Sequence, residues 1–173
     1  MPEHEDRIAV YTGSFDPISL GHLNVIERGR RLFRRLIVGV GQNIDKESLF
    51  TQDERVELVR RVTSQWDNVD VQAFDGLAVT FVRACGARVM LRGIRPLTDL
   101  AGEFTMMMAN RKLDEGIETI FLMADGELAH VSSSLIKQIT PLADDERLQR
   151  FVPAAIIPDL RARIAELPKP ARS

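Results

Sequence analysis

The sequence predicts an α/β fold in which a doubly wound, parallel five-stranded sheet carries helices on both faces. Two observations indicate this class. Short apolar runs recur at even intervals, and stretches with one apolar helical face lie between them. Unbroken apolar runs are typical of strands buried on both faces, and their alternation with helices favours parallel strands joined by right-handed crossovers. The expected strands are Ile8–Tyr11, Leu36–Val40, Val69–Phe74, Val89–Leu91 and Ile120–Met123.

The first expected strand leads into a turn that contains Gly13, Pro17 and Gly21, and a helical pattern begins after His22. A helix N-terminus offers backbone N–H groups and a partial positive charge, and glycine lets a phosphate approach the backbone closely. We therefore expect an anion site at this turn. His22 should lie in the first turn of the helix, directed at the anion.

The other helices follow from amphipathic stretches. One follows Thr51-Gln-Asp-Glu54, which is typical of a helix cap with acidic residues in the first turn. Further helices are expected at Leu77–Cys85, Leu97–Leu113, Leu135–Ile139 and Pro153–Leu167. The last two would form a C-terminal helical segment. We expect a single domain over residues 1–173, with a core of about 8–160 and frayed tails at 1–6 and 168–173.

Composition limits the function. The chain has 173 residues and 45% hydrophobic content, enough for one well-filled core. Its net charge of −2 provides no general basic field, so we expect no nucleic-acid partner. Cys85 is the single cysteine, which fits a reducing cytoplasm. No apolar run approaches the roughly 20 residues that span a bilayer, and no signal-peptide core is present, so we expect a cytoplasmic protein without a membrane partner.

Ligands of such sheets bind at the carboxyl ends of the strands. Five segments fall at that edge and hold nearly all the chemically active side chains: Thr12–His22, Gln42–Phe50, Asp75–Ala78, Arg92–Leu97 and Ala124–Ser134.

Three groups at this edge are candidates for phosphate binding. Lys46, taken alone, is as consistent with a solvated loop lysine as with a ligand. Arg92-Gly-Ile-Arg95 could clamp phosphates by bidentate bonding or form an ordinary surface turn. Ser132-Ser-Ser134 offers hydroxyls and backbone N–H groups at a helix start, although plain capping explains one serine. A second helix N-terminus facing the first would form a two-sided cradle for a polyphosphate.

Other side chains are less informative. Glu103 alone is best interpreted as a solvated helix residue, and Met106-Met-Met108 as core or pocket lining. His4 and Cys85 are expected to be structural, while the role of His130 stays open. The sequence has no G-x-x-x-x-G-K-[ST], no G-x-G-x-x-G after the first strand, no Cys/His cluster for zinc and no G-x-S-x-G elbow.

Taken together, Thr-Gly-Ser-Phe-Asp-Pro-(x3)-Gly-His22, Lys46, Arg92-Gly-Ile-Arg95 and Val131-Ser-Ser-Ser134 closely resemble the bacterial phosphopantetheine adenylyltransferases of the nucleotidylyltransferase superfamily. The resemblance covers residues 8 to about 160 in unbroken order. It implies a Rossmann-like sheet and a homohexamer. It also implies that ATP and 4′-phosphopantetheine give dephospho-CoA and pyrophosphate, with Mg²⁺, in coenzyme A biosynthesis.

The resemblance further implies roles for individual residues. The expected catalytic residues are Ser14, His22, Lys46 and Arg95. Residues expected to bind ATP are Ser14, Phe15, His22, Gly93, Ile94, Arg95, Glu103, Leu128, Ala129, His130, Val131, Ser132, Ser133 and Ser134. Residues expected to bind phosphopantetheine are Ser14, Lys46, Leu77, Ala78, Arg92 and Asn110. The metal ligands stay unassigned.

Several positions depart from the family pattern. Ser14 replaces the commoner Thr, and Ser19 stands where the signature usually has Thr, His or Asn. Gly102 falls where an aromatic residue is frequent, and Leu128-Ala-His130 replaces an aromatic-bearing segment. All of these substitutions leave the expected phosphate ligands in place.

The implied acceptor is itself a phosphate monoester and is largely dianionic at neutral pH, because its second pKa is about 6. It needs no general base. It needs positive charge that reduces the repulsion between its own phosphate and those of ATP while it attacks the α-phosphorus in line. Rival hypotheses are the same chemistry on nicotinamide mononucleotide or glycerol phosphate, a non-catalytic nucleotide-binding regulator, and a flavodoxin-like electron carrier.

Overall fold

The computed structural model describes residues 7–42, 47–95 and 100–167, and within them it confirms the doubly wound parallel sheet. The strand order is β3-β2-β1-β4-β5, with every neighbouring pair parallel. The five expected strands are all present, as β1 Ile8–Gly13, β2 Arg35–Val40, β3 Val69–Ala73, β4 Val89–Ile94 and β5 Glu118–Met123. Both expected tails, 1–6 and 168–173, lie outside the described residues.

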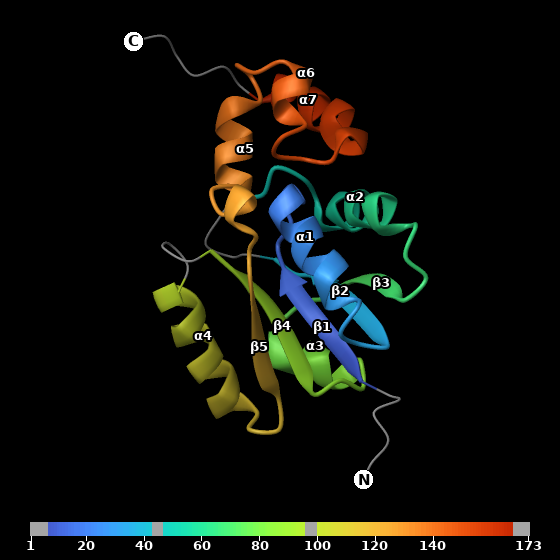
Figure 1. Cartoon of the computed structure of the whole chain (residues 1–173), viewed down its shortest axis with the longest axis vertical. Coiled ribbons are helices and arrows are strands. Elements are labelled where there is room, and N and C mark those ends of the chain that lie inside the picture. The colour runs from blue at the N-terminus through green and yellow to red at the C-terminus, as the bar shows by residue number, and fades with distance from the viewer. Residues whose placement is uncertain (1–6, 43–46, 96–99, 168–173) are drawn as a thin grey trace.

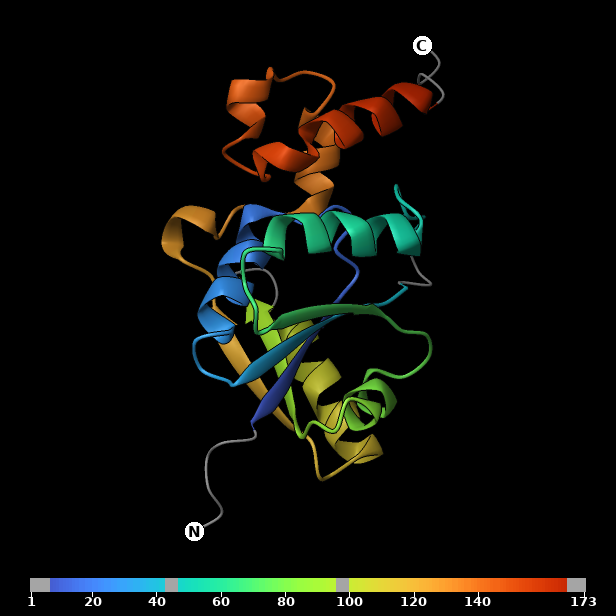
Figure 2. The same ribbon diagram turned by 90° about the vertical axis from the view of Figure 1, so that its right-hand side faces the viewer.

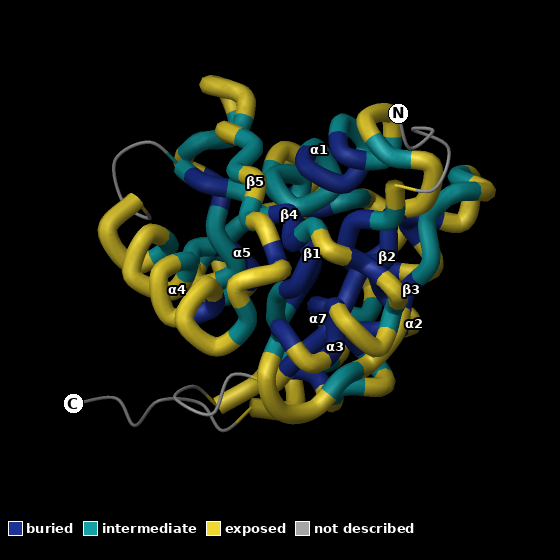
Figure 3. Tube along the Cα trace, turned by 90° about the horizontal axis from the view of Figure 1, so that it is seen from below, coloured by how far each residue is buried: buried dark blue, intermediate teal, exposed yellow. Residues whose placement is uncertain are grey.

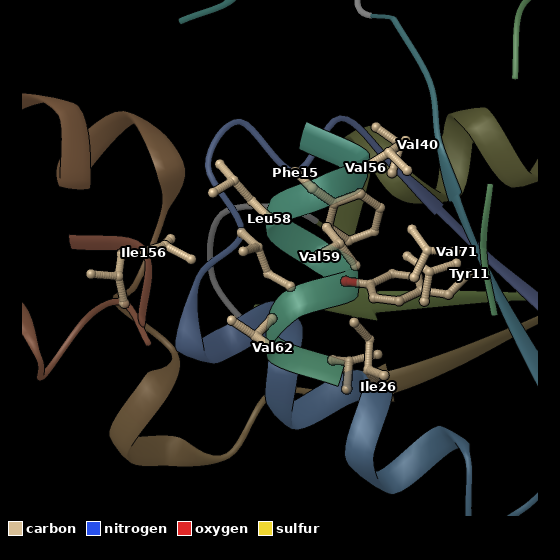
Figure 4. Packing of buried hydrophobic residues seen from close by; sticks show 14 of the residues in the cluster. Tyr11, Phe15, Ile26, Val40, Val56, Leu58, Val59, Val62, Val71 and Ile156 are labelled. Carbon is tan, nitrogen blue, oxygen red and sulfur yellow. The ribbon is translucent and has the colours of Figure 1, made fainter. Parts of the chain in front are cut away.

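Side chains of the central strands alternate between two cores, because successive residues of a strand point to opposite faces. Ala9 and Tyr11 of β1 belong to the larger cluster, whereas Val10 belongs to the smaller one. Figure 4 shows the larger cluster from close by, with Tyr11 and Val71 from the sheet packed against Val59. A sheet buried on both faces explains why these strands are continuous apolar runs.

Helices cover both faces of the sheet. Figure 2 shows α1 (Leu20–Gly29) and α2 (Gln52–Thr63) on one face, and α3 (Ala78–Ala84) and α4 (Leu100–Leu113) on the other. The Thr51 cap is confirmed, since its side chain accepts from the Glu54 backbone N–H while Glu54 accepts from that of Thr51. Because all strands are parallel, each segment that leads from a strand into the next helix lies at the carboxyl edge of the sheet.

The C-terminal helical segment lies beyond that edge (Figure 1). After a short turn, η2 (Gly126–Leu128), it consists of α5 (Ser133–Ile139), α6 (Asp145–Leu148), η3 (Ala154–Ile156) and α7 (Ile157–Glu166). The helices expected at Leu135–Ile139 and Pro153–Leu167 are therefore confirmed, and α6 is additional. Leu148, Ile156 and Leu160 are fully buried and join the segment to the larger core.

The outer surface of α4 differs from the expectation. Met106 and Met108 were expected to fill the core or line a pocket, yet they are 55% and 53% exposed. Asn110 is the one side chain of the described helix that is buried, and Figure 3 shows α4 exposed along most of its length. The helix is apolar on several sides, so it does not present a single amphipathic stripe to the sheet.

Within the described ranges, no helix combines the length and the apolar character that crossing a bilayer requires.

Candidate active site

A cleft of about 460 Å³ opens at the carboxyl edge of the sheet. Its walls come from the ends of β1, β4 and β5 and from the starts of α1, α4 and α5. Twelve of the residues expected to bind substrates line it: Ser14, His22, Arg92, Gly93, Ile94, Arg95, Glu103, Leu128, Val131, Ser132, Ser133 and Ser134. The starts of α1 and α5 share this cleft, as the two-sided cradle requires.

The turn after β1 is shaped by Phe15. Its φ is +48°, and the residue is 1% exposed. The ring packs edge-on against Tyr11, with centroids 5.2 Å apart, and lies beside α2 in Figure 4. A Cβ on Gly13 would stand 3.0 Å from that ring, so a larger residue there would require the ring to shift. Phe15 was expected to bind ATP; its side chain belongs to the larger core and does not line the cleft, and its contact with ATP stays a prediction.

His22 lies in the first turn of α1, as expected. Its Nδ1 accepts a hydrogen bond from the Ser19 backbone N–H at 3.1 Å, while the Ser19 hydroxyl caps the helix by accepting from the His22 N–H. A backbone N–H can only donate, so Nδ1 of the neutral ring is the acceptor and Nε2 carries the hydrogen. The Phe15 ring packs on the imidazole with centroids 5.0 Å apart. Cap and ring packing together present an N–H donor, which suits a phosphate oxygen.

Arg92 and Glu103 face each other inside the cleft. Nη2 and Nε of Arg92 donate to the two carboxylate oxygens of Glu103 at 2.5 and 2.8 Å, while Nη1 donates to the Thr12 carbonyl at 2.5 Å. The two side chains are 25% and 19% exposed. The residue expected to hold the acceptor phosphate therefore lies within direct hydrogen-bonding reach of a residue expected to serve the nucleotide.

Arg95 and the serine segment (Ser132–Ser134) also line the cleft. Nη1 of Arg95 donates to the Val131 carbonyl at 3.4 Å. Ser132 caps α5 by accepting from the Leu135 N–H at 3.1 Å, and the Ser133 hydroxyl donates to the Pro17 carbonyl at 2.9 Å. Simple capping thus accounts for Ser132 alone. Ser133 ties the start of α5 to the turn after β1, and Ser134 is exposed on the cleft wall.

Buried charges support the same turn. The Asp16 carboxylate accepts from the backbone N–H groups of Leu49 and Phe50 at 2.8 and 2.9 Å, and from Lys137 Nζ at 2.6 Å. Arg55 of α2 is 1% exposed and donates to the carbonyls of Ser14 and Gly41. The turn is therefore held by α2, by the segment just before α2 and by α5 at once.

Other expected site residues lie away from this wall. Leu77 is 54% exposed at the start of α3, followed by Ala78. Asn110 is buried, with Nδ2 3.5 Å from the Met90 sulfur, because it faces the sheet from the third turn of α4. Ala129 does not line the cleft, and His130 packs edge-on against Phe151 outside it. Lys46 lies outside the described residues.

Sequence reasoning missed several parts of the site. Thr12, Ser19 and Val25 also line the cleft. A serine three residues before a histidine resembles a capping box, except that histidine replaces the usual Glu or Gln, so the signal was present but incomplete. Arg55 had no signal, because an arginine on a capped helix is normally solvated.

Comparisons with known proteins agree with the resemblance. A family model described as cytidylyltransferase-like matches residues 10–139. The chain is 65% identical over 159 residues to a phosphopantetheine adenylyltransferase of Rhodopirellula baltica, covering 91% of this chain and 89% of that protein. It is 44% identical to the protein of that name from Clostridium beijerinckii, covering 91% and 98%. The fold matches the Plasmodium falciparum nicotinic acid mononucleotide adenylyltransferase complexed with NaAD, with a TM-score of 0.66 at 13% identity over 93% and 95% of the two chains.

Proposed function

Because the chain belongs to the phosphopantetheine adenylyltransferase family, we propose that this cleft performs the reaction of that family, using the residues that line it. The protein transfers the adenylyl group of ATP to 4′-phosphopantetheine and yields dephospho-CoA and pyrophosphate. One observation supports this assignment above the others: His22, Arg92, Arg95 and the start of α1 converge on one cleft. Two mutually repelling anions can meet there.

The mechanism that this geometry supports is in-line displacement. The acceptor phosphate attacks the α-phosphorus of ATP, the new P–O bond forms, and the bond to pyrophosphate breaks. The Nε2 hydrogen of His22 and the backbone N–H groups at the start of α1 stabilise the charge that develops on the α-phosphate. Arg95 neutralises the nucleotide phosphates. No general base is required, so positioning and charge stabilisation supply the catalysis.

We propose that Arg92 and Lys46 bind the acceptor phosphate. Arg92 lines the cleft beside Thr12 at the end of β1, and its positive charge attracts a phosphate there. The Glu103 carboxylate forms an ion pair with that guanidinium and so orients it. The assignment of Lys46 rests on the family resemblance alone.

Magnesium enters this proposal with the nucleotide. Within the described residues there is no group of three or more metal-ligating side chains. Glu103 is the one carboxylate among the described residues of the cleft wall, and it is engaged by Arg92. Magnesium commonly keeps several waters and binds through substrate phosphates. We propose that ATP arrives as its Mg²⁺ complex, in which the metal reduces the negative charge of the phosphates.

We propose that the protein is a homohexamer. Leu100, Phe104 and Met108 form one stripe along α4, and Met106 and Leu113 lie on a different side of it; each is more than half exposed. A helix that is apolar on several sides is normally buried. Closed hexamers with dihedral symmetry need two kinds of subunit contact. Two separate apolar stripes on one helix suit such an assembly.

The cytoplasm is the proposed location. Cys85 is the single cysteine of the chain and is free. A thiol without a disulfide partner is typical of proteins in reducing compartments.

Pyrophosphate release from the purified protein tests the function. With ATP, Mg²⁺ and 4′-phosphopantetheine, pyrophosphate and dephospho-CoA should accumulate in equal amounts. Nicotinamide mononucleotide and glycerol phosphate serve as matched alternative acceptors and should give little product. Faster release with either of them would contradict the proposed acceptor, and no release with any acceptor would contradict the enzymatic assignment.

A further inference from the structure

We propose that Arg55 is a positioning residue for the reaction, holding the turn that carries Ser14 in its reactive shape; this inference rests on the proposed function of the same cleft. Arg55 lies in the first turn of α2, and its side chain extends beneath the cleft wall. It is among the largest fully buried side chains of the described protein, at 1% exposure. No part of the guanidinium lines the cleft, so any effect on catalysis must pass through other groups.

The contacts of Arg55 identify Ser14 as the residue through which it acts. Its Nη1 donates to the Ser14 carbonyl at 2.6 Å and to the Gly41 carbonyl at 2.7 Å. The ladder between β1 and β2 pairs Gly13 with Val40, and its last bond runs from the Gly41 N–H to the Gly13 carbonyl at 2.9 Å. Beyond this point the sheet supplies no donor for Ser14 or Gly41. Arg55 replaces the missing sheet contact with one nitrogen that joins both strand ends.

Three successive carbonyls of this segment are thus held by different elements. Arg92 of β4 binds Thr12, the backbone of Gly41 binds Gly13, and Arg55 of α2 binds Ser14. Ser14 is the last of the three and lines the cleft. The Gly41 contact holds the peptide plane that carries the Ser14 N–H, and the Arg55 contact holds the next plane. Between them they place the Ser14 Cα and therefore its hydroxyl relative to the phosphates.

The burial of Arg55 is difficult to explain by stability alone. Desolvation lowers the pKa of its guanidinium, although Asp16 nearby acts in the opposite direction. Its Nε is buried and has no hydrogen-bond partner within the described structure. Removing a charged group from water is costly, and well-packed apolar side chains often stabilise such a site at least as well. The contacts of this buried guanidinium with two strand-end carbonyls fit a geometric role.

Neighbouring contacts make the position of the turn depend on α2. The Phe15 ring packs beside α2 near Val59 (Figure 4), and Asp16 binds the two backbone N–H groups that precede the helix cap. Ring and carboxylate fix the far side of the turn. Arg55 fixes the side that carries Ser14, so its loss should shift Ser14 while the rest of the turn remains in place.

Arg55→Lys is the sharpest test because it keeps the charge. The lysine nitrogen ends one bond short of Nη1, a deficit of about 1.3 Å. Misplacing a positioning group by that much can lower turnover by about 10²-fold. We expect kcat to fall about 10-fold to 10²-fold, with the KM values for ATP and phosphopantetheine within about threefold of the wild type.

A double-mutant cycle separates positioning from a general loss of structure. Ser14→Ala removes the hydroxyl that Arg55 is proposed to place, so Arg55→Lys should cost about threefold or less in the Ser14→Ala background. Arg60→Lys is the matched control, because Arg60 belongs to the same helix but donates to Val71 at 3.0 Å, away from the cleft. Its kcat should equal that of the wild type. Circular dichroism melting confirms that each variant is folded.

An unchanged kcat in Arg55→Lys, or fully multiplicative losses in the double variant, would overturn the inference. Should the lysine variant fail to fold, Arg55→Gln takes its place. Failure of both to fold would assign Arg55 to stability alone and also overturn it. A wild-type protein that releases no pyrophosphate would remove the proposed function and this inference together, whereas an active wild type with unaffected variants removes the inference only.

Discussion

His22 derives its chemistry from two neighbours that fix its ring. The Ser19 backbone N–H determines which nitrogen accepts, and the Phe15 ring restricts the tilt of the imidazole. A donor held in advance costs no reorganisation when charge develops on the phosphate. The sequence indicated a histidine in the first turn of a helix. Which of its two ring nitrogens accepts a hydrogen bond and which carries the hydrogen depends on contacts that form only in the folded turn.

Replacing His22 by Ala should lower kcat by about 10²-fold or more, by analogy with the loss of an oxyanion donor. The KM for ATP should change less, because Arg95 and the serine segment of the cleft remain. Steady-state kinetics of pyrophosphate release measure both values. Equal losses in kcat and in ATP binding would contradict a role in the transition state.

Lys46 should act mainly in acceptor binding. Lys46→Ala is expected to raise the KM for phosphopantetheine and leave kcat closer to the wild-type value, because the lost charge contacts substrate and transition state alike. Lys112→Ala, an exposed lysine in the last turn of α4, is the matched control and should have no effect. An unchanged KM for phosphopantetheine in Lys46→Ala would refute the assignment.

At the scale of elements, ion pairs join helices that the sequence places far apart. Arg83 of α3 binds Asp114, which follows α4, through two hydrogen bonds of 2.7 Å. Gly116 completes the arrangement, since a Cβ there would lie 2.1 Å from the Arg83 guanidinium. The Arg83 contact and the Gly116 N–H lower the pKa of Asp114 from 3.8 to about 2. The same pair brings α3 and the end of α4 together on one face of the sheet.

This pair predicts an acid-dependent contribution to stability. Because the pKa of Asp114 is lower in the folded chain, its contribution is present above about pH 4 and is lost as the pH falls towards 2. Asp114→Asn should therefore melt at a lower temperature than the wild type at pH 6. This difference in melting temperature should become smaller at pH 2 to 3. Glu115→Gln, at an exposed neighbour, is the control. A difference in melting temperature that stays constant with pH would show that the titration of Asp114 does not contribute to stability.

At the scale of the whole molecule, the described part of the chain leaves apolar side chains of α4 exposed and places β5 at one edge of the sheet. Met123 of β5 is 55% exposed, and β5 ends the sheet on that side. Exposed edge strands and apolar helix faces are commonly covered by a partner. A second copy of the chain is the partner that the proposed hexamer supplies.

Phe104→Lys combined with Met108→Lys should therefore reduce the molar mass measured by light scattering, because two charges on one stripe cannot be buried without partners. Leu142→Lys is the control: Leu142 is 85% exposed and lies between α5 and α6, away from α4. Its molar mass should match the wild type. A hexameric mass in the Phe104/Met108 variant would contradict the role of this stripe, and a monomeric wild type would contradict the hexamer itself.

The sequence by itself determined the five strands, the Thr51 cap and most of the cleft wall, because burial patterns and capping signals act over a few residues. Tertiary structure alone decided that the Phe15 ring enters the core, that Arg92 pairs with Glu103, and that Arg55 lies beneath Ser14. Each of these contacts joins elements distant in the chain, and its geometry exists only after the sheet and helices have packed. The exposed face of α4 belongs to the same category, since a local pattern of apolar residues does not show whether the rest of the chain covers them.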